Sequence, residues 1–272
     1  MEVAILMSTY NGSSYIIEQI DSIIHQSFKE WKLYIRDDGS KDNTIGIINN
    51  YIKKDSRIKL LNDDIKHRGC KDSFLWLLKN VNADYYFFSD QDDVWLEDKV
   101  EYSLVALESM PNSLPCVVAT DLQLVDSALN LIAPSMWESN HIVKLVSDPI
   151  NLQIAPLYPG CSIGFNEKAK IQALQYESHS FLSNILHDQL ILLSSYKAKG
   201  NIKALPAAKV LYRQHDKNVV GAYVGKSILM SKFMQLKKTL RKNIDYYKIA
   251  HNFLGTNLYT YLSLKIKHLL SY

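Results

Sequence analysis

Apolar residues in the first half of the chain fall into short runs, separated by segments with helical spacing. The runs cover residues 3–7 (VAILM), 32–36 (KLYIR), 57–61 (RIKLL), 84–88 (DYYFF) and 116–120 (CVVAT). Runs of this length, rich in Val, Ile, Tyr and Phe, predict buried β-strands. Strands that alternate with helices predict an α/β fold, in which a mostly parallel sheet is flanked by helices.

The segments between these runs place isoleucines on one side of a helix. These residues are Ile16, Ile20, Ile23 and Ile24 in the first segment, and Ile45, Ile48 and Ile52 in the second. Residues 73–80 and 96–109 predict two further helices. Beyond residue 120 the pattern weakens: residues 161–165 and 209–212 fit strands, and residues 188–197 fit a helix.

Polar clusters directly follow three of the predicted strands. They are Ser8-Thr9-Tyr10-Asn11-Gly12, Asp37-Asp38-Gly39-Ser40 and Ser89-Asp90-Gln91-Asp92-Asp93. The carboxyl ends of parallel strands lie at the same edge of a sheet, and ligands of open α/β sheets bind there. We therefore expect the three clusters to meet on one rim and to form an active site.

The third cluster concentrates acidic residues at the end of a very apolar strand. Asp90, Asp92 and Asp93 lie within four positions, so their charges repel one another. Carboxylate oxygens are ligands that Mg²⁺ and Mn²⁺ prefer, and such a cation would relieve the repulsion. A solvated acidic loop has the same composition, but the position after a buried strand favours a site for a metal and a phosphate.

Composition and length narrow the class of protein. The 272 residues are 47% hydrophobic and 11% aromatic, which argues against disorder. No apolar run approaches the ~20 residues that span a bilayer, and the N-terminus has no basic leader, so we expect no signal peptide. Cys70, Cys116 and Cys161 lie far apart without the spacing of a zinc site, which suits a reducing cytoplasm.

Charge is divided unevenly along the chain. Residues 1–225 carry 22 basic and 27 acidic residues, whereas residues 226–272 carry nine Lys or Arg and a single acid, Asp245. Residues 226–242 predict a basic amphipathic helix, which either packs on the body or lies on an anionic membrane. Its apolar stripe consists of Leu229, Phe233, Leu236 and Leu240. The basic residues lack interleaved aromatic residues, so we expect no nucleic-acid partner.

Several short motifs, taken in order, resemble those of one protein family. VAILMSTYNG, IRDDGSKDNT, YYFFSDQDDVWLEDKVE, PGCSIGF, HDQ and YRQH are similar to motifs of the family 2 inverting glycosyltransferases, which have the Rossmann-like GT-A fold. The rhamnosyltransferase-like branch, which builds bacterial surface polysaccharide, is the most similar. The resemblance implies a catalytic domain at 1–220, with a nucleotide-sugar half (1–120) and an acceptor half (121–220), followed by a basic helical extension at 221–272.

The resemblance implies a donor site on the three polar clusters. Tyr10 would lie against the base, Asp38 would contact it, and Asp92 would bind Mn²⁺ or Mg²⁺ with Asp90 and His215, although a lone histidine is more often structural. The basic residues of the loop 63–73 are either diphosphate contacts or surface charges. The residues implied or proposed in nucleotide binding are Ser8, Thr9, Tyr10, Asn11, Asp38, Arg68, Lys71, Asp90 and Arg213.

The resemblance also implies a general base and an acceptor site. Asp188, in His187-Asp188-Gln189, matches the carboxylate that deprotonates the acceptor hydroxyl, although the family more commonly has Glu where this chain has His187. The alternative for Asp188 is a role in capping a helix. The candidates for acceptor binding are Trp95, Gly160, Cys161 and His187.

The activity implied by the resemblance is transfer of a sugar, with inversion, from dTDP-rhamnose or a UDP-hexose to an undecaprenyl-diphosphate-linked glycan. Such an enzyme would serve O-antigen or capsule synthesis, in the cytoplasm and peripherally on the inner face of the membrane. One alternative is a haloacid-dehalogenase-like phosphatase, because Asp90, Asp92 and Val94 fit its D-x-D-x-V motif. That family also needs a Gly-Asp pair, which this chain lacks. A second alternative is a non-catalytic sugar-binding protein.

Overall fold

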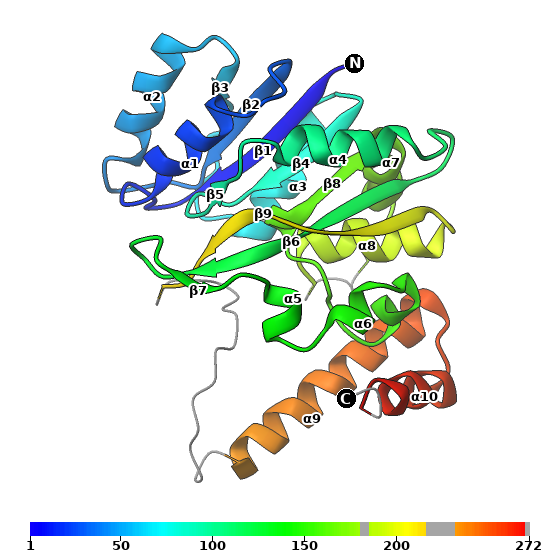
Figure 1. Cartoon of the computed structure of the whole chain (residues 1–272). Helices are drawn as coiled ribbons and strands as arrows, with labels where there is room; N and C mark the ends of the chain where they lie inside the picture. Colours follow the sequence, from blue (N-terminus) through cyan, green and yellow to red (C-terminus); the bar gives the residue numbers. More distant parts are fainter. Residues whose placement is uncertain (180–184, 216–231, 270–272) are drawn as a thin grey trace.

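A single nine-stranded sheet runs through the computed structural model, which describes residues 1–179, 185–215 and 232–269 (Figure 1). The strands are ordered β3-β2-β1-β4-β8-β6-β9-β5, and β7 pairs with β6. Their bounds are β1 (Val3–Thr9), β2 (Trp31–Asp37), β3 (Ile58–Leu60), β4 (Tyr85–Ser89), β5 (Val94–Trp95), β6 (Cys116–Val125), β7 (Leu131–Ala133), β8 (Ile163–Asn166) and β9 (Asn201–Arg213).

The direction of the strands differs between the two halves of the sheet. β3, β2, β1 and β4 are all parallel. β8 runs antiparallel to β4 and to β6, and β9 runs parallel to β6. The sheet and its helices confirm the predicted α/β class. Strand β6 (Cys116–Val125) spans residue 120, where we predicted the boundary between the donor half and the acceptor half. The division into these two halves stays a prediction.

Helices cover both faces of the sheet. Those of the body are α1 (Ile16–Ile24), α2 (Thr44–Lys54), α3 (Cys70–Asn80), α4 (Lys99–Glu108), α5 (Met136–Ser139), α6 (Val143–Val146), α7 (Glu167–Leu174) and α8 (His187–Lys197), with short 3₁₀ turns η1 (Pro149–Gln153) and η2 (Gly160–Ser162). Right-handed crossovers put α1 and α2 on one face and α3 on the other, because the chain reverses its direction along the sheet after β3. α7 and α8 contact α3 and each other, so these three helices share a face.

The core is densest around β4, the centre of the sheet. All five residues of β4 are buried, and Phe87 lies opposite Gly164 of the neighbouring strand β8. A Cβ atom on Gly164 would lie 2.5 Å from the Phe87 ring, which is closer than packed atoms approach. A residue without a side chain at this position therefore lets the two strands pair.

Most of the predicted elements are present, with shifted ends. The helix predicted at 73–80 begins earlier, at Cys70, and the one predicted at 96–109 begins later, at Lys99. In α2 the predicted face is only partly correct, because Ile48 is buried while Ile45 is 38% exposed. The short helices between β7 and η2 were not predicted, since residues 134–153 show no sustained period.

The C-terminal helices differ most from the prediction. The expected helix at 226–242 appears as α9 (Lys232–Ile249), which continues through a π-helical segment, η4 (Ala250–Leu254), to an unpredicted helix, α10 (Leu258–Leu269). In Figure 1 these helices lie together beyond α5 and α6, at the opposite end of the molecule from the N-terminus. Leu229 lies outside the described residues, as do the side chains of the rest of the predicted stripe. Within the described part of the chain, no helix has the length and apolar character of a membrane span.

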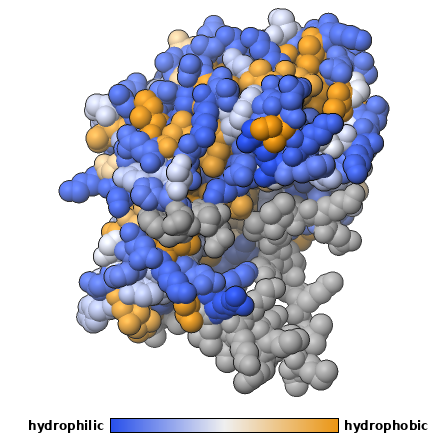
Figure 2. All heavy atoms as spheres, turned by 180° about the vertical axis from the view of Figure 1, so that it is seen from behind, coloured by the Kyte–Doolittle hydropathy of each residue, from blue (hydrophilic) through white to orange (hydrophobic). Residues whose placement is uncertain are grey.

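The surface of the body is mainly hydrophilic. Figure 2 shows apolar side chains as scattered groups on the face opposite to that of Figure 1. Single exposed apolar residues of this kind are usual on globular proteins.

We expect Gly164→Ala to lower the free energy of unfolding by about 1–3 kcal/mol, because the new methyl group overpacks the contact with Phe87. Urea denaturation measures this change. Gly46→Ala on the exposed side of α2 is the matched control: only the flexible end of Asn43 is in the way, and alanine favours a helix over glycine by up to about 1 kcal/mol. Equal stability of wild type and Gly164→Ala would contradict the packing argument.

Candidate active site

The three polar clusters lie side by side at the carboxyl ends of β1, β2 and β4. Thr9 pairs in register with Asp37, and its hydroxyl donates to the Asp37 carboxylate over 2.9 Å. The amide N–H of Tyr10 donates to Gln91 Oε1 over 2.9 Å, and Gln91 Nε2 donates back to the Tyr10 carbonyl over 3.1 Å. These cross-links confirm that the clusters meet on one rim.

The first cluster presents an aromatic ring at this rim. Ser8 and Thr9 end β1, and Asn11 has a φ of 49°, which turns the chain sharply into Gly12. The Tyr10 side chain is 45% exposed and meets the His67 ring edge to face at 5.7 Å. A half-exposed ring beside a second ring can stack on a planar base, as predicted for Tyr10.

Asp38 is held in a buried network of ions. Its carboxylate accepts hydrogen bonds from Arg36 Nη1 at 2.8 Å and from the backbone N–H groups of Arg68 and Gly69, each at 2.9 Å. Burial alone would raise the pKa of Asp38, but these donors outweigh it and hold the pKa below its ordinary value. In this structure Asp38 anchors the loop 63–69 to the end of β2, and its contact with a base stays a prediction.

The two basic candidates of this loop lie in different surroundings. Arg68 forms an ion pair with Asp63 at 2.6 Å, and Asp63 also pairs with Arg36. Lys71 lies in the first turn of α3 and is half-buried, which lowers its pKa. Arg68 is thus engaged within the loop, and a phosphate contact by either residue stays a prediction.

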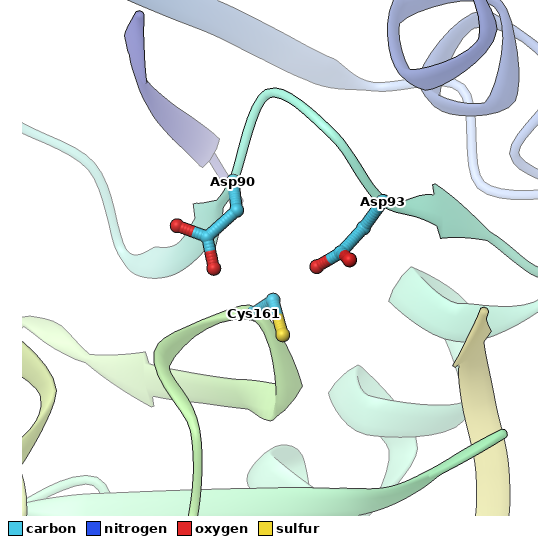
Figure 3. A group of neighbouring side chains, drawn as sticks. All are labelled: Asp90, Asp93 and Cys161. Atoms are coloured by element: carbon cyan, nitrogen blue, oxygen red, sulfur yellow. The ribbon is translucent and has the colours of Figure 1, made fainter. Parts of the chain in front are cut away.

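The acidic cluster is compact and largely shielded from solvent. Figure 3 shows Asp90 and Asp93, from the two ends of the loop after β4, pointing toward Cys161 in η2. Ligand atoms of these three residues lie within 4.8 Å of one another. Burial, and then the charges of Asp92 and Asp188, raise the pKa of Asp90 to about 7. Burial, Asp92 and Asp90 raise the pKa of Asp93 as well.

Asp92, between Asp90 and Asp93 in the sequence, is paired with His215. Asp92 Oδ2 and His215 Nε2 lie 2.9 Å apart although 123 positions separate them in the chain. The His215 ring stacks on Tyr15 at 5.0 Å, which fixes its orientation. The structure therefore brings together the carboxylate and the imidazole that were predicted to share a metal.

Arg213 holds the acidic loop in place through hydrogen bonds to Asp92 and Asp93. Its guanidinium is buried; it forms an ion pair with Glu18 and donates to the carbonyl oxygens of Asp92 (2.7 Å) and Ser127 (2.6 Å). The Arg213 backbone N–H donates to Asp93 Oδ1 over 3.1 Å. These contacts give Arg213 a positioning role in the loop, and the predicted pairing with phosphate is not tested.

Asp188 lies in the first turn of α8 and faces the acidic loop. Its side chain is 7% exposed, and burial raises its pKa to about 6 although backbone N–H groups of Gln189 and Gly160 donate to it. A Cβ atom on Gly160 would lie 3.0 Å from His187 Nε2 and 3.5 Å from Asp188 Cβ. The absence of a side chain at Gly160 thus allows the loop before β8 to approach the carboxylate closely.

Two predicted acceptor residues lie in the interior instead of on the rim. His187 stacks on Phe74 at 4.0 Å and meets the edge of Phe88 at 4.6 Å; burial lowers its pKa to about 3. Trp95 is 3% exposed and packs against Phe87. As placed here, neither aromatic face is open to a sugar, because both rings fill the core beneath the site. Among the residues that the structure describes, neither ring nitrogen of His187 has a hydrogen-bond partner.

The residues of the rim fit a divalent cation. Among the residues that the structure describes, Asp93 Oδ2 is buried without a hydrogen-bond partner, and the charges of Asp92 and Asp188 raise the cost of ionising Asp90. Carboxylate oxygens and a histidine nitrogen suit Mg²⁺ or Mn²⁺. Burial and the nearby acids raise the pKa of the Cys161 thiol, which keeps it a neutral and poor ligand for such ions.

The family model of glycosyl transferase family 2 matches residues 4–169, which include β1 to β8 and the whole acidic loop. The chain belongs to glycosyl transferase family 2. This membership confirms the family resemblance. The D-x-D-x-V motif that suggested a phosphatase lies after β4, inside the region matched by the glycosyl transferase model, and it is therefore assigned to that family. Asp188 and His215 lie beyond that region.

Two named transferases are similar to this chain in sequence. The dTDP-rhamnosyl transferase RfbG of Shigella flexneri is 31% identical over 228 residues, which are 80% of this chain and 74% of RfbG. The UDP-Glc:alpha-D-GlcNAc-diphosphoundecaprenol beta-1,3-glucosyltransferase WfgD of Escherichia coli is 33% identical over 102 residues, 38% of this chain and 39% of WfgD. The chain thus spans about three quarters of the first relative and well under half of the second.

Solved structures confirm the GT-A fold of this family. Residues 1–349 of TarS from S. aureus, in complex with UDP-GlcNAc, match with a TM-score of 0.62 and 18% identity, covering 98% of this chain and 73% of that fragment. The mannosyltransferase PcManGT of Pyrobaculum calidifontis, in complex with GDP-Man and Mn²⁺, matches with a TM-score of 0.61 and 14% identity, covering 99% of this chain and 80% of PcManGT.

The site contains residues that the sequence prediction missed. Arg36 interrupts the apolar pattern of β2 just before Asp37, and a charge inside a buried strand could have pointed to an internal ion pair. Lys99 is fully buried, with its ammonium 4.1 Å from the centre of the Trp95 ring, and it has no hydrogen-bond partner in the described part of the chain. Burial lowers the pKa of Lys99 to about 7, while Cys161 and Asp93 act in the opposite direction. Lys99 lies four and eight residues before Ser103 and Leu107, on the buried side of α4, and this spacing could have predicted that the lysine is buried.

Without a divalent cation, ionisation of Asp90 opposes folding. The pKa of Asp90 rises from 3.8 to about 7 in the folded chain. The folded state therefore binds the Asp90 proton more tightly than the unfolded state, and the free energy of unfolding falls as the pH rises through this range. Asp90→Asn removes the carboxylate, and we expect its stability advantage over wild type to grow between pH ~4 and ~7 to on the order of 2 kcal/mol.

Thermal unfolding in a chelator, at a series of pH values, measures this advantage. Added Mn²⁺ should narrow it, since the cation favours the ionised wild type. Glu108→Gln on the exposed end of α4 is the control and should show no such trend. An Asp90→Asn advantage that stays constant across this pH range would show that Asp90 ionises normally.

Proposed function

We propose that this protein transfers a sugar, with inversion, from a nucleotide-diphosphate donor to a hydroxyl group of a lipid-linked oligosaccharide. The observation that carries the proposal is the convergence of Asp90, Asp92 and Asp188 at the carboxyl ends of the strands, in a chain of glycosyl transferase family 2. One side of that rim offers an exposed ring, Tyr10, to a base, and the other offers a buried carboxylate to an acceptor.

The donor that we propose first is dTDP-rhamnose, with a UDP-hexose as the second choice. RfbG, which is named for dTDP-rhamnosyl transfer, is similar over 80% of this chain. WfgD, named for transfer from UDP-Glc, is similar over a shorter segment. Ser8, Thr9, Asn11 and Asp38 are the further residues that we place around the nucleotide.

A divalent cation, Mn²⁺ or Mg²⁺, fits the pair formed by Asp92 and His215 together with Asp90. When bound, it would neutralise the diphosphate leaving group. The protein's own contribution is to hold these ligands: Arg213 fixes the backbone of Asp92 and Asp93, and Tyr15 orients the His215 ring.

Asp188 is the proposed general base. Its carboxylate accepts the proton of the acceptor hydroxyl while that oxygen attacks the anomeric carbon and the bond to the diphosphate breaks. A single displacement of this kind inverts the configuration. The raised pKa of about 6 brings Asp188 near the operating pH, where a general base works best.

The acceptor that we propose is an undecaprenyl-diphosphate-linked glycan. WfgD is named for such an acceptor, and RfbG is a rhamnosyl transferase by name. Gly160 and Cys161 form the wall next to Asp188 on the acceptor side. The enzyme would then serve O-antigen or capsule synthesis at the inner face of the cytoplasmic membrane.

A donor screen tests the activity. We expect dTDP-rhamnose or a UDP-hexose, with a lipid-diphosphate glycan acceptor, to give release of nucleoside diphosphate that depends on Mn²⁺ or Mg²⁺. Asp92→Ala should lower this release by about 10²-fold or more, because it removes a metal ligand, whereas Glu108→Ala should not. No turnover with any donor would favour the sugar-binding alternative, and full activity of Asp92→Ala would refute the metal assignment.

Asp188→Asn tests the base. We expect transfer to fall by about 10²–10⁴-fold with unchanged donor affinity, measured by isothermal titration. In wild type, kcat/KM should rise with pH and level off above an apparent pKa of about 6 or lower, since only ionised Asp188 accepts the proton and a bound cation lowers its pKa. An unaltered pH profile in Asp188→Asn would assign the base to another residue.

A further inference from the structure

The C-terminal unit, defined here as α9, η4 and α10, is attached to the body through buried contacts. Thr256 Oγ1 donates to Gln153 Oε1 over 2.7 Å in a buried hydrogen bond. Lys197, at the end of α8, donates to the carbonyl oxygen of Phe253 and lies 4.6 Å above its ring. Phe253 is only 1% exposed. These contacts make the unit a part of the folded body.

The attachment lies on the acceptor side of the site. The Tyr246 hydroxyl of α9 donates to the Leu152 carbonyl of η1 over 2.8 Å. Burial raises the pKa of Tyr246, and the charges of Tyr261 and Asp188 add to the rise. Tyr246 therefore lies within electrostatic reach of the proposed base, which opens the first turn of α8.

One face of α10 packs on α9. The Tyr261 hydroxyl donates to the Asn243 carbonyl, and Lys265 Nζ donates to Asn243 Oδ1, each over 3.0 Å. The Tyr261 ring also meets Tyr247 edge to face at 5.1 Å, and it is 4% exposed. The orientation of α10 is therefore fixed, and so is the face that it turns outward.

A second face of α10 is apolar and exposed. Leu258, Leu262 and Ile266 follow one another at intervals of four residues, and Tyr259 lies beside them, so all four share one side of the helix. Their exposed fractions are 52%, 48%, 54% and 83% in that order. Figure 2 shows apolar side chains on the lobe at the lower left, where the C-terminal helices lie. A continuous apolar stripe is typical of an interaction surface.

The charges of the C-terminal unit indicate the kind of partner. Between residues 241 and 269 the chain has five Lys or Arg and one acid, Asp245. Arg241, Lys242, Lys248 and Lys267 are exposed. Apolar side chains with basic neighbours suit the boundary between the headgroups and acyl chains of an anionic membrane. Symmetric pairing of two copies through this unit would instead bring like charges together.

We propose that α10 lies on an anionic membrane surface through Leu258, Tyr259, Leu262 and Ile266. The surface differs from the stripe predicted at 226–242, because it belongs to a helix that the sequence pattern did not predict. It does not require the proposed reaction. The attachment of the C-terminal unit beside Asp188, through Tyr246, would bring a lipid-linked acceptor toward the base, and that part rests on the proposed function.

Vesicle flotation of the full chain tests the proposal. Wild type should bind vesicles of phosphatidylglycerol and phosphatidylethanolamine, should bind pure phosphatidylcholine weakly, and should dissociate as salt is added. The double variant Leu262→Glu with Ile266→Glu should bind the anionic vesicles about tenfold or more weakly. Val105→Glu on α4 is the matched control, since Val105 is 66% exposed on the body, and it should bind as wild type does.

Two results would overturn the proposal. One is wild-type affinity of the double variant for anionic vesicles. The other is a combination of two observations: the wild type does not bind anionic vesicles, and light scattering without lipid shows a dimer for the wild type but a monomer for the double variant. The stripe would then bind a second copy of the chain. Nucleoside diphosphate release with a soluble acceptor should be unchanged in the double variant, and its absence in wild type would contradict the proposed function alone.

Discussion

Mutual repulsion among buried carboxylates is the constraint around which the site is organised. Asp90, Asp92 and Asp93 follow the most deeply buried strand, and Asp188 faces them from α8. Burial removes the water that would screen these charges, so the acids around Asp90 and Asp93 raise the cost of ionising them. Burial and these charges raise the pKa of Asp90 to about 7, and burial raises the pKa of Asp188 to about 6. A polypeptide retains such an arrangement when a bound cation uses it, and the remaining contacts of the rim serve to hold it.

Two buried guanidinium groups hold the loops around these acids. Arg36 pairs with Asp38 and Asp63 on the nucleotide side. Arg213 joins Glu18 to the backbone of the acidic loop on the other side. Each arginine links segments that the sheet brings close but does not pair. Removing Arg36 would leave the buried Asp38 without its counter-ion, which is more costly than losing a surface ion pair.

The parts of this architecture that local sequence pattern controls could be predicted. The first four strands and the convergence of their polar ends follow from apolar runs and from the geometry of parallel strands. The positions of Asp188 and His215 came from a family resemblance, and their proximity to the acidic loop depends on β8, β6 and β9, whose order no local pattern reveals. His187 and Trp95 were misplaced because an aromatic ring near a site has the same sequence signal whether it faces a ligand or the core. The apolar stripe of α10 was missed because its buried and exposed apolar faces lie next to each other, so no single period stands out.

The central position of β4 has a consequence for the newly made chain. β4 gains its first neighbour, β1, from residues already synthesised, but its other neighbour, β8, comes from much later in the sequence. Until β8 is available, this aromatic, fully buried strand has an unpaired edge, and such edges promote association with other chains. The acidic loop that ends β4 adds negative charge at one end of this edge, and like charges discourage the edges of two chains from joining. The same carboxylates that form the rim of the finished site can thus protect the unfinished sheet.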